Sequence, residues 1–264
     1  MRPDGRTGGR ANGRTRGRAD RRAGVRGIVV ALWQAAVVTA CAAAPLAAQI
    51  GHPPGSSPFH DLTMRQTLSF GVGRFGGNTA VAGVGWRAGM LYAGRFDTRL
   101  SGPLDLTATL GVAASSRFRI DTEADSATRV SGPVDRALLL ADIGLVLNLT
   151  GAKTWHGVAP YVGFGAGWMR PWGETELDPG GYNAGPNFTF VPSLGTRVFF
   201  GRTLAARLEV RDYIWRYEWP LRYYEPYDVN DNPIYPPILA PAVSPKQWAH
   251  NLTLTFGVVY AFNF

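Results

Sequence analysis

The segment from Leu252 to Phe264 restricts the fold of this chain more than any other feature. Its side chains alternate in character along the whole length. Leu252, Leu254, Phe256, Val258, Tyr260, Phe262 and Phe264 form an apolar set, and Thr253, Thr255, Gly257, Val259, Ala261 and Asn263 form a small or polar set. Successive side chains of a β-strand point to opposite faces, so this pattern predicts a strand with one apolar face. Chain ends in water usually fray. An aromatic last residue that continues the apolar face therefore indicates surroundings other than water.

The same alternation recurs upstream, and from about Met64 onward no helical period competes with it. It predicts eight strands, near residues 64–75, 83–98, 104–118, 136–150, 159–172, 187–200, 204–216 and 248–264. The links after the second, fourth and sixth strands are short, whereas those after the third, fifth and seventh are long. The link after the first, around Gly76, is shorter than this pattern expects. Alternating short and long links are typical of outer-membrane barrels. The sequence therefore predicts an all-β fold, an eight-stranded antiparallel transmembrane up-and-down β-barrel over residues 64–264.

A secreted lipocalin-like barrel has the same strand count but keeps its apolar face inside, around a ligand. Three observations favour the membrane barrel. Lys153 and Lys246 are the only lysines, whereas a solvated exterior needs many charges. Aromatic residues gather near strand ends, as an interfacial girdle requires; they are Tyr213, Trp215, Tyr217 and Trp219 at one boundary and Tyr260, Phe262 and Phe264 at the other. The third observation is the terminal phenylalanine.

The N-terminal residues have the features of an export signal. Nine of the 27 basic residues lie in residues 1–48, and without them the basic and acidic side chains nearly balance, which removes the case for a nucleic-acid partner. An apolar run from Ile28 is too short to span a bilayer and is closed by Pro45. A small-residue stretch follows, so we predict a signal peptide over residues 1–48, cleaved after Ala48, and a short Pro-rich segment over 49–63. An uncleaved anchor is the alternative.

Cys41 is the only cysteine, and it falls within the predicted signal. The mature chain is then expected to contain no disulfide. Val38-Thr39-Ala40-Cys41 also resembles the lipobox of bacterial lipoproteins, which would make Cys41 a lipidated first residue. That alternative stays open.

Three segments together resemble the outer-membrane β-barrel domain family, similar to the membrane domain of outer membrane protein A. They are Leu252–Phe264, the strand Pro160–Gly167 and the strand Arg207–Tyr213. The resemblance covers about residues 64–264. It implies residence in the bacterial outer membrane, contact with its lipid, and a C-terminal signal for the barrel-assembly machinery. That signal comprises Phe256, Tyr260, Phe262 and Phe264.

Alternation also places charges inside the predicted barrel. Arg207, Glu209 and Arg211 share the face opposite Leu208 and Val210. The same counting turns further charged side chains inward on other strands, namely Asp142, Arg197, Arg87 and Arg95. Charges in a narrow lumen are costly unless paired, so we predict a charge network of Arg207, Glu209, Arg211 and Asp142 that fills the interior. A gated ion path through it is the alternative.

Candidate chemistry is sparse, and we expect no catalytic, cofactor or metal site. A lipid-modifying enzyme would need a base such as His250, for which the sequence offers no serine partner; a Ser or Asp within reach of it would favour this reading. Asp228-Val-Asn-Asp-Asn232 has oxygens at alternate positions, but it lacks the glycine and glutamate of a calcium loop. Gly71–Gly76 imitates a nucleotide fingerprint, yet no helix follows.

The predicted function is structural or interactive, exerted through the extracellular loops, with an unknown loop ligand. Exposed tyrosines of the longest loop, Tyr223, Tyr224, Tyr227 and Tyr235, are candidates for a binding surface or for packing on one another. A small-solute or ion channel, a lipid-modifying enzyme and a lipocalin-like carrier are the alternatives.

Overall fold

The computed structural model describes residues 57–173, 177–228 and 230–263. All but Ser57 belong to one compact unit, which begins at Pro58. The predicted signal peptide, Cys41 and Phe264 lie outside the described residues. No helix within the described ranges is long and apolar enough to cross a membrane.

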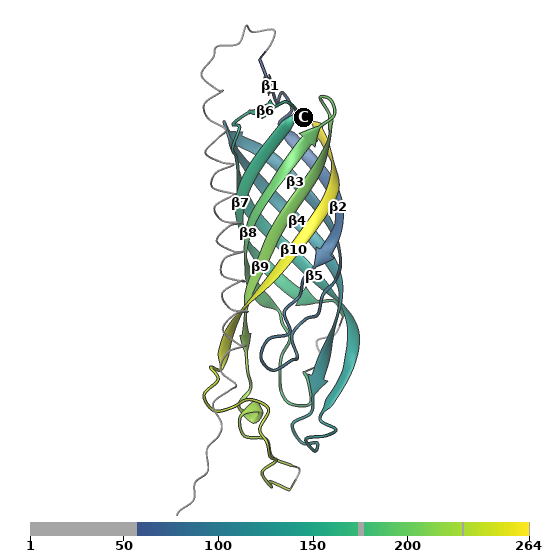
Figure 1. The fold of residues 1–264 in the computed structure, drawn as a ribbon, viewed down its shortest axis with the longest axis vertical. Coiled ribbons are helices and arrows are strands. Elements are labelled where there is room, and N and C mark those ends of the chain that lie inside the picture. The colour runs from purple at the N-terminus through teal and green to yellow at the C-terminus, as the bar shows by residue number, and fades with distance from the viewer. Residues whose placement is uncertain (1–56, 174–176, 229, 264) are drawn as a thin grey trace, which may run out of the picture. The chain divides into compact units, whose positions relative to one another are not determined.

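Eight long antiparallel strands form a closed barrel, as predicted. They are β2 (Gln66–Phe75), β3 (Gly89–Ser101), β4 (Leu104–Ile120), β5 (Val130–Asn148), β7 (Val158–Pro171), β8 (Asn187–Phe199), β9 (Leu204–Glu218) and β10 (Lys246–Phe262). Each pairs with the next, and β10 closes the ring by pairing with β2. Figure 1 shows the short turns at one end, with the C-terminal end of β10, and the long loops at the other. We call these the short-turn end and the long-loop end.

Three short elements were not predicted. β1 (Phe59–Asp61) pairs antiparallel with β6 (Lys153–Trp155) at the short-turn end, where Phe59 lies opposite Trp155. A single 3-10 turn, η3 (Leu221–Tyr223), lies in the loop between β9 and β10. Each element has three residues, which is too few for alternation to reveal.

The second barrel strand begins later than predicted. Residues 76–88 form a loop at the long-loop end instead of a short link followed by strand, and Gly77 and Gly83 have positive φ values in it. Trp86 is consequently buried, although strand alternation placed it on the outer face. Arg87 is exposed with its guanidinium 5.3 Å from the centre of the Phe118 ring, so its predicted inward position was wrong. The reason is that parity cannot be extended past the end of a strand.

The two faces of the barrel wall differ sharply in chemistry. Most outward side chains of the strands are large, apolar and exposed, with Phe70 at 66% and Phe164 at 59% exposure. The inward face holds most of the buried arginines and carboxylates. An apolar exterior around a polar interior is the reverse of a lipocalin and suits a barrel surrounded by lipid.

Candidate functional site in the barrel lumen

Glu209 of β9 is the centre of an ion-pair network in the lumen. Its carboxylate accepts hydrogen bonds from the guanidinium groups of Arg95 and Arg211 and from the Tyr161 hydroxyl, which lies 2.6 Å away. The Glu209 and Arg95 side chains are each about 5% exposed. Four strands contribute to this network. Glu209 and Arg211 belong to β9, Arg95 to β3 and Tyr161 to β7, and Arg211 also binds Asp142 of β5.

Toward the long-loop end, Arg211 extends the network. Its Nη1 donates to both carboxylate oxygens of Asp142, at 3.0 and 2.9 Å. The Tyr213 hydroxyl donates to the same carboxylate at 3.3 Å. Asp142 therefore connects the charged part of the lumen to the aromatic part that begins at Tyr213.

Toward the short-turn end, Asp97 and Asp105 continue the ion-pair network. Asp97 pairs with Arg95 and with Arg207, each at 2.5 Å, and accepts a hydrogen bond from the Thr67 hydroxyl at 2.8 Å. Asp105 pairs with Arg197 at 3.3 Å and accepts from the Asn148 side chain at 2.8 Å.

The network nearly balances its own charge. Its arginines are Arg95, Arg99, Arg197, Arg207 and Arg211, and its carboxylates are Asp97, Asp105, Asp142 and Glu209. A cavity of about 30 Å³ beside Arg95, Arg207 and Glu209 has room for one or two water molecules. Buried charges of this kind persist only when each is paired and hydrogen-bonded. The arrangement is therefore a packed polar core.

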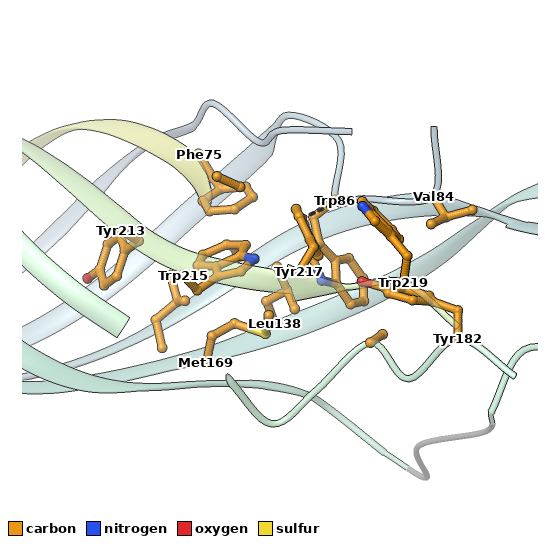
Figure 2. Packing of buried hydrophobic residues seen from close by; sticks show 14 of the residues in the cluster. Phe75, Val84, Trp86, Leu138, Met169, Tyr182, Tyr213, Trp215, Tyr217 and Trp219 are labelled. Carbon is orange, nitrogen blue, oxygen red and sulfur yellow. Dashed lines mark hydrogen bonds between the residues drawn. The ribbon is translucent and has the colours of Figure 1, made fainter. Parts of the chain in front are cut away.

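A cluster of aromatic side chains fills the lumen beyond the charges, toward the long-loop end (Figure 2). Its members include Phe75, Trp86, Tyr182, Tyr213, Trp215, Tyr217, Trp219 and Tyr223. Phe75 stacks on Trp215 with ring centres 6.3 Å apart, and Tyr217 stacks on Trp219 at 5.5 Å. We call this cluster the aromatic plug.

The plug corrects one sequence prediction. Tyr213, Trp215 and Tyr217 were assigned to an interfacial girdle because they lie near a strand end. The structure buries all three, each at most 2% exposed. They share the odd-numbered positions of β9 with Arg207, Glu209 and Arg211, so alternation turns them into the lumen. Trp219 follows them into the plug.

A buried ion pair fastens the loops to the plug. Arg117 at the end of β4 donates to both carboxylate oxygens of Asp178, at 2.7 and 2.6 Å, and Asp178 has no exposed side-chain surface. The Arg117 guanidinium also lies 5.7 Å from the ring centres of Trp86 and Tyr182. Burial raises the pKa of the Tyr182 phenol well above its ordinary value. We call the Arg117–Asp178 pair the loop latch.

The structure brings together all four residues of the predicted charge network, and Arg95 and Arg197 join them. Sequence reasoning missed Asp97, Tyr161 and the loop latch as members of the lumen core. Asp97 follows Arg95 by two positions, and Tyr161 precedes the outward Val162, so alternation could have found both. Asp178 lies in a loop, where no periodicity applies.

The C-terminal residues face outward. Phe256 and Tyr260 are more than half exposed on the lipid-facing side of β10, and the Phe262 ring stacks on Tyr260 with centres 5.8 Å apart. Their role as an assembly signal stays a prediction, as does that of Phe264.

The longest loop satisfies its own polar groups. Asp228 accepts hydrogen bonds from the backbone N–H groups of Asn230 and Asn232, both at 2.8 Å, and from the Asn232 side chain at 3.0 Å. These bonds, above all those from Asn232, lower the pKa of Asp228. Within the described ranges no three His, Cys, Asp or Glu side chains are grouped to hold a metal. Of the loop tyrosines, Tyr223 packs into the plug, while Tyr227 and Tyr235 are exposed.

His250 has a partner that sequence did not reveal. Its Nδ1 lies 2.6 Å from an Asp212 carboxylate oxygen on the neighbouring strand β9. Both residues occupy outward positions in their strands, so the pair lies on the lipid-facing wall and is separate from the lumen network.

Comparisons with known proteins found similar solved structures at low sequence identity. No protein-family model matches the chain, and no curated protein matches it significantly. Similar solved structures include the N-terminal β-barrel domain of OprF from Pseudomonas aeruginosa, with 11% identity and a TM-score of 0.41 over 75% of this chain and 98% of that one. OprG of the same organism has 10% identity and a TM-score of 0.46, over 79% and 100%. Neisserial surface protein A has 12% identity and a TM-score of 0.44, over 78% and 98%.

The orientation of the barrel follows from its connections. Outer-membrane barrels have short periplasmic turns and longer extracellular loops, which assigns the long-loop end to the cell exterior. A closed ring gives every barrel strand a hydrogen-bonded neighbour on each side, as a sheet that crosses lipid requires, and its exterior is apolar. From its closure, its exterior and its loop asymmetry, the chain is an eight-stranded β-barrel of the outer-membrane type.

Proposed function

We propose that this protein is a closed, non-conducting barrel that stabilises the outer membrane and presents its long loops at the cell surface. One observation carries the proposal. The lumen is filled in two successive layers, the charge network around Glu209 and then the aromatic plug, and the largest side chains of the plug are fully buried. An eight-stranded lumen is just wide enough for its own side chains, so the filled interior argues against a channel.

The loops support the surface role because they pack on one another. Beyond the loop latch, Arg222 pairs with Glu123 at 2.8 Å, and Arg129 donates to the Pro236 carbonyl at 2.7 Å. The loops after β4 and β9 are thereby joined. A preorganised surface loses less entropy on binding than free loops do. Among the described residues of these loops, Leu221 and Tyr235 are the most exposed large hydrophobic side chains.

Conductance measurements test the closed lumen. The purified barrel is inserted into planar lipid bilayers, and the same preparation is tested for solute entry in a liposome-swelling assay. We expect no stepwise current and no sugar entry. The double variant Glu209→Ala/Arg211→Ala empties the centre of the lumen. It serves as a control for whether the two assays can detect an open lumen. Regular single-channel steps from the unaltered protein would overturn the proposal in favour of the channel.

Complementation separates the structural role from the loop role. A strain lacking the protein is supplied with the intact chain or with a variant whose residues 226–236 are replaced by a short Gly/Ser linker. Recovery of detergent resistance by both proteins would support a structural role of the barrel. Recovery by the intact chain alone would support a role of the loops, and recovery by neither would contradict both.

A further inference from the structure

Asp212 and His250 are ionisable residues on the wall that contacts lipid. Outward positions of β9 include Leu208 and Val210, and those of β10 include Leu252 and Leu254, so the neighbours of the pair along each strand are apolar. An ionisable residue facing the membrane is costly, and it is rarely retained without a function. The pair is not needed to fill the lumen, because it points away from it.

The geometry of the pair fixes the orientation of the imidazole. Asp212 holds Nδ1 at 2.6 Å, which leaves Nε2 without a partner from this carboxylate. The His250 side chain is 66% exposed, whereas that of Asp212 is 21% exposed. A carboxylate that is partly covered and bound to Nδ1 selects the tautomer with a basic Nε2. That nitrogen is available at the lipid-facing surface.

The pair lies at the depth where lipid ester groups are found. Trp248 is the next outward residue of β10, about 7 Å further along the strand toward the long-loop end. Tryptophan marks the membrane–water interface. Arg216 lies opposite Trp248, Lys246 and Glu218 follow beyond them, and both cations pair with Glu218. His250 is therefore just on the membrane side of the outer interface, where acyl chains meet headgroups.

The barrel wall is interrupted beside the pair. In the ladder between β8 and β9, Phe190 lies opposite Ile214 and Ser193 lies opposite Arg211, while Val191 and Pro192 between them are unpaired with β9. Proline has no N–H to donate. Toward the long-loop end a cleft of about 560 Å³ separates the start of β8 from the end of β9, and its lining includes Phe188, Arg216 and Trp248. This cleft is large enough for a lipid headgroup and adjoins the pair through Trp248.

We propose that Asp212 and His250 form a general-base dyad that hydrolyses an acyl ester of an outer-leaflet lipid. Nε2 of His250 removes a proton from water as the water oxygen attacks the ester carbonyl carbon. The tetrahedral intermediate then expels the alcohol, which takes that proton from His250, so the acyl C–O bond breaks and a fatty acid and an alcohol leave. Asp212 acts as a positioning residue that orients the ring and stabilises the imidazolium. Water is the only co-reactant, and no oxidant or metal is required for the balance.

The test measures fatty-acid release by mass spectrometry. Purified full-length barrel is incubated in mixed micelles with phosphatidylethanolamine and, separately, with lipopolysaccharide, which distinguishes the two sources of acyl ester. General-base catalysis contributes about 10²- to 10⁴-fold, so His250→Ala is expected to reduce release about 100-fold or more. Asp212→Asn keeps a hydrogen-bond acceptor but removes the charge, so it is expected to lower kcat with little change in KM. Asp212→Glu restores the charge and is expected to recover part of the lost kcat.

Control variants keep the test decisive. Ile143→Ala removes an exposed lipid-facing side chain from β5, on the opposite wall, and is expected to retain full activity. Heat-modified electrophoretic mobility verifies that every variant is a folded barrel. The proposal would be overturned if the folded, unaltered protein released no more fatty acid from either lipid than the His250→Ala variant does. Equal kcat for Asp212→Asn and the unaltered protein would overturn the role of Asp212. Neither outcome bears on whether the lumen conducts.

Discussion

At the scale of single residues, Glu209 determines the stability of the lumen. Its carboxylate is the shared partner of Arg95 and Arg211 and accepts the Tyr161 hydroxyl. Glu209→Ala would leave two buried guanidinium groups without this partner. Removal of one member of a buried ion pair typically costs about 3–5 kcal/mol. We therefore expect the variant to unfold at a lower urea concentration, as measured by loss of heat-modified mobility in lipid vesicles.

Glu218→Ala is the matched control for this prediction. Glu218 is on the same strand and also contacts two cations, Arg216 at 2.7 Å and Lys246 at 3.7 Å, but its side chain is 57% exposed. Exposed pairs contribute about 0–1 kcal/mol. If both variants unfold at the same urea concentration, the lumen network does not stabilise the barrel.

Side-chain direction was predictable from sequence wherever a strand was regular. Parity alone turned Arg207, Glu209 and Arg211 inward, and the structure joins them. Parity gives the wrong direction for Arg87, which precedes the strand. It gives the right direction for Trp215, whose nearness to a strand end instead favours an interfacial girdle. Contacts across the lumen, such as Tyr161 with Glu209, depend on the register between strands distant in sequence, and no local pattern contains that information.

At the scale of elements, the loop latch holds residues 177–186 against the barrel. Asp178 is fully buried and binds Arg117 through two hydrogen bonds, with Arg119 at 3.3 Å. Asp178→Asn removes the charge that these arginines require, so we expect the loop to detach more readily. Its cleavage by protease added to intact cells is expected to accelerate about 10-fold or more. This corresponds to a loss of at least about 1.4 kcal/mol in the free energy of loop docking. Glu123→Gln, in the exposed pair with Arg222, is expected to leave cleavage unchanged. Equal cleavage of the two variants would contradict the role of the latch.

The plug tyrosines give the loops an alkaline limit. Burial raises the pKa of Tyr182 and of Tyr223 above the ordinary tyrosine value, while a released loop would ionise near pH 10. Below that pH both states are neutral and the packing is fully stable. Above it only the released state ionises, so the packed loop loses about 1.4 kcal/mol of stability per pH unit for each tyrosine, until the raised pKa is passed.

The measurement for this limit is the rate of loop cleavage by subtilisin from pH 8 to above pH 10, with phenylalanine substitutions as controls. Tyr182→Phe cannot ionise and is expected to accelerate less steeply with pH than the unaltered protein, and the double variant with Tyr223→Phe less steeply again. Parallel pH profiles for all three proteins would show that these phenols do not set the limit.

Secondary structure was more predictable than the links between strands. The alternation of apolar and polar residues makes β10 and its neighbours recognisable as strands in the sequence, because lipid selects apolar residues on one face only. The loop at residues 76–88 was misjudged because Trp86 and Ala88 happen to continue the apolar alternation of Met90 and Tyr92 into a segment that leaves the wall. Segments as short as β1 and β6 become strands only by pairing with each other across a large sequence separation, and no local sequence pattern indicates that pairing.

At the scale of the whole molecule, stability depends on closure between β2 and β10, the strands furthest apart in sequence. Gly73 lies at this seam, opposite Thr255. A Cβ atom at Gly73 would lie 2.0 Å from the Leu254 carbonyl oxygen and 2.7 Å from the Thr255 Cα, both backbone atoms. The strands can meet at this register only because residue 73 has no side chain.

Gly73→Ala is therefore expected to reduce the fraction of protein that closes, at a cost of about 1–3 kcal/mol for forced overpacking. Gly94→Ala is the matched control, since a Cβ there would meet only the Phe70 ring, at 3.6 Å, an ordinary contact. The measurement is the heat-modified fraction after refolding into lipid vesicles, with tryptophan fluorescence as a second signal. Because both substitutions add one methyl group to a barrel strand, a difference between them isolates the seam. Equal folding yields would mean that β2 and β10 can separate enough to admit the methyl group, and closure would then not depend on this close approach.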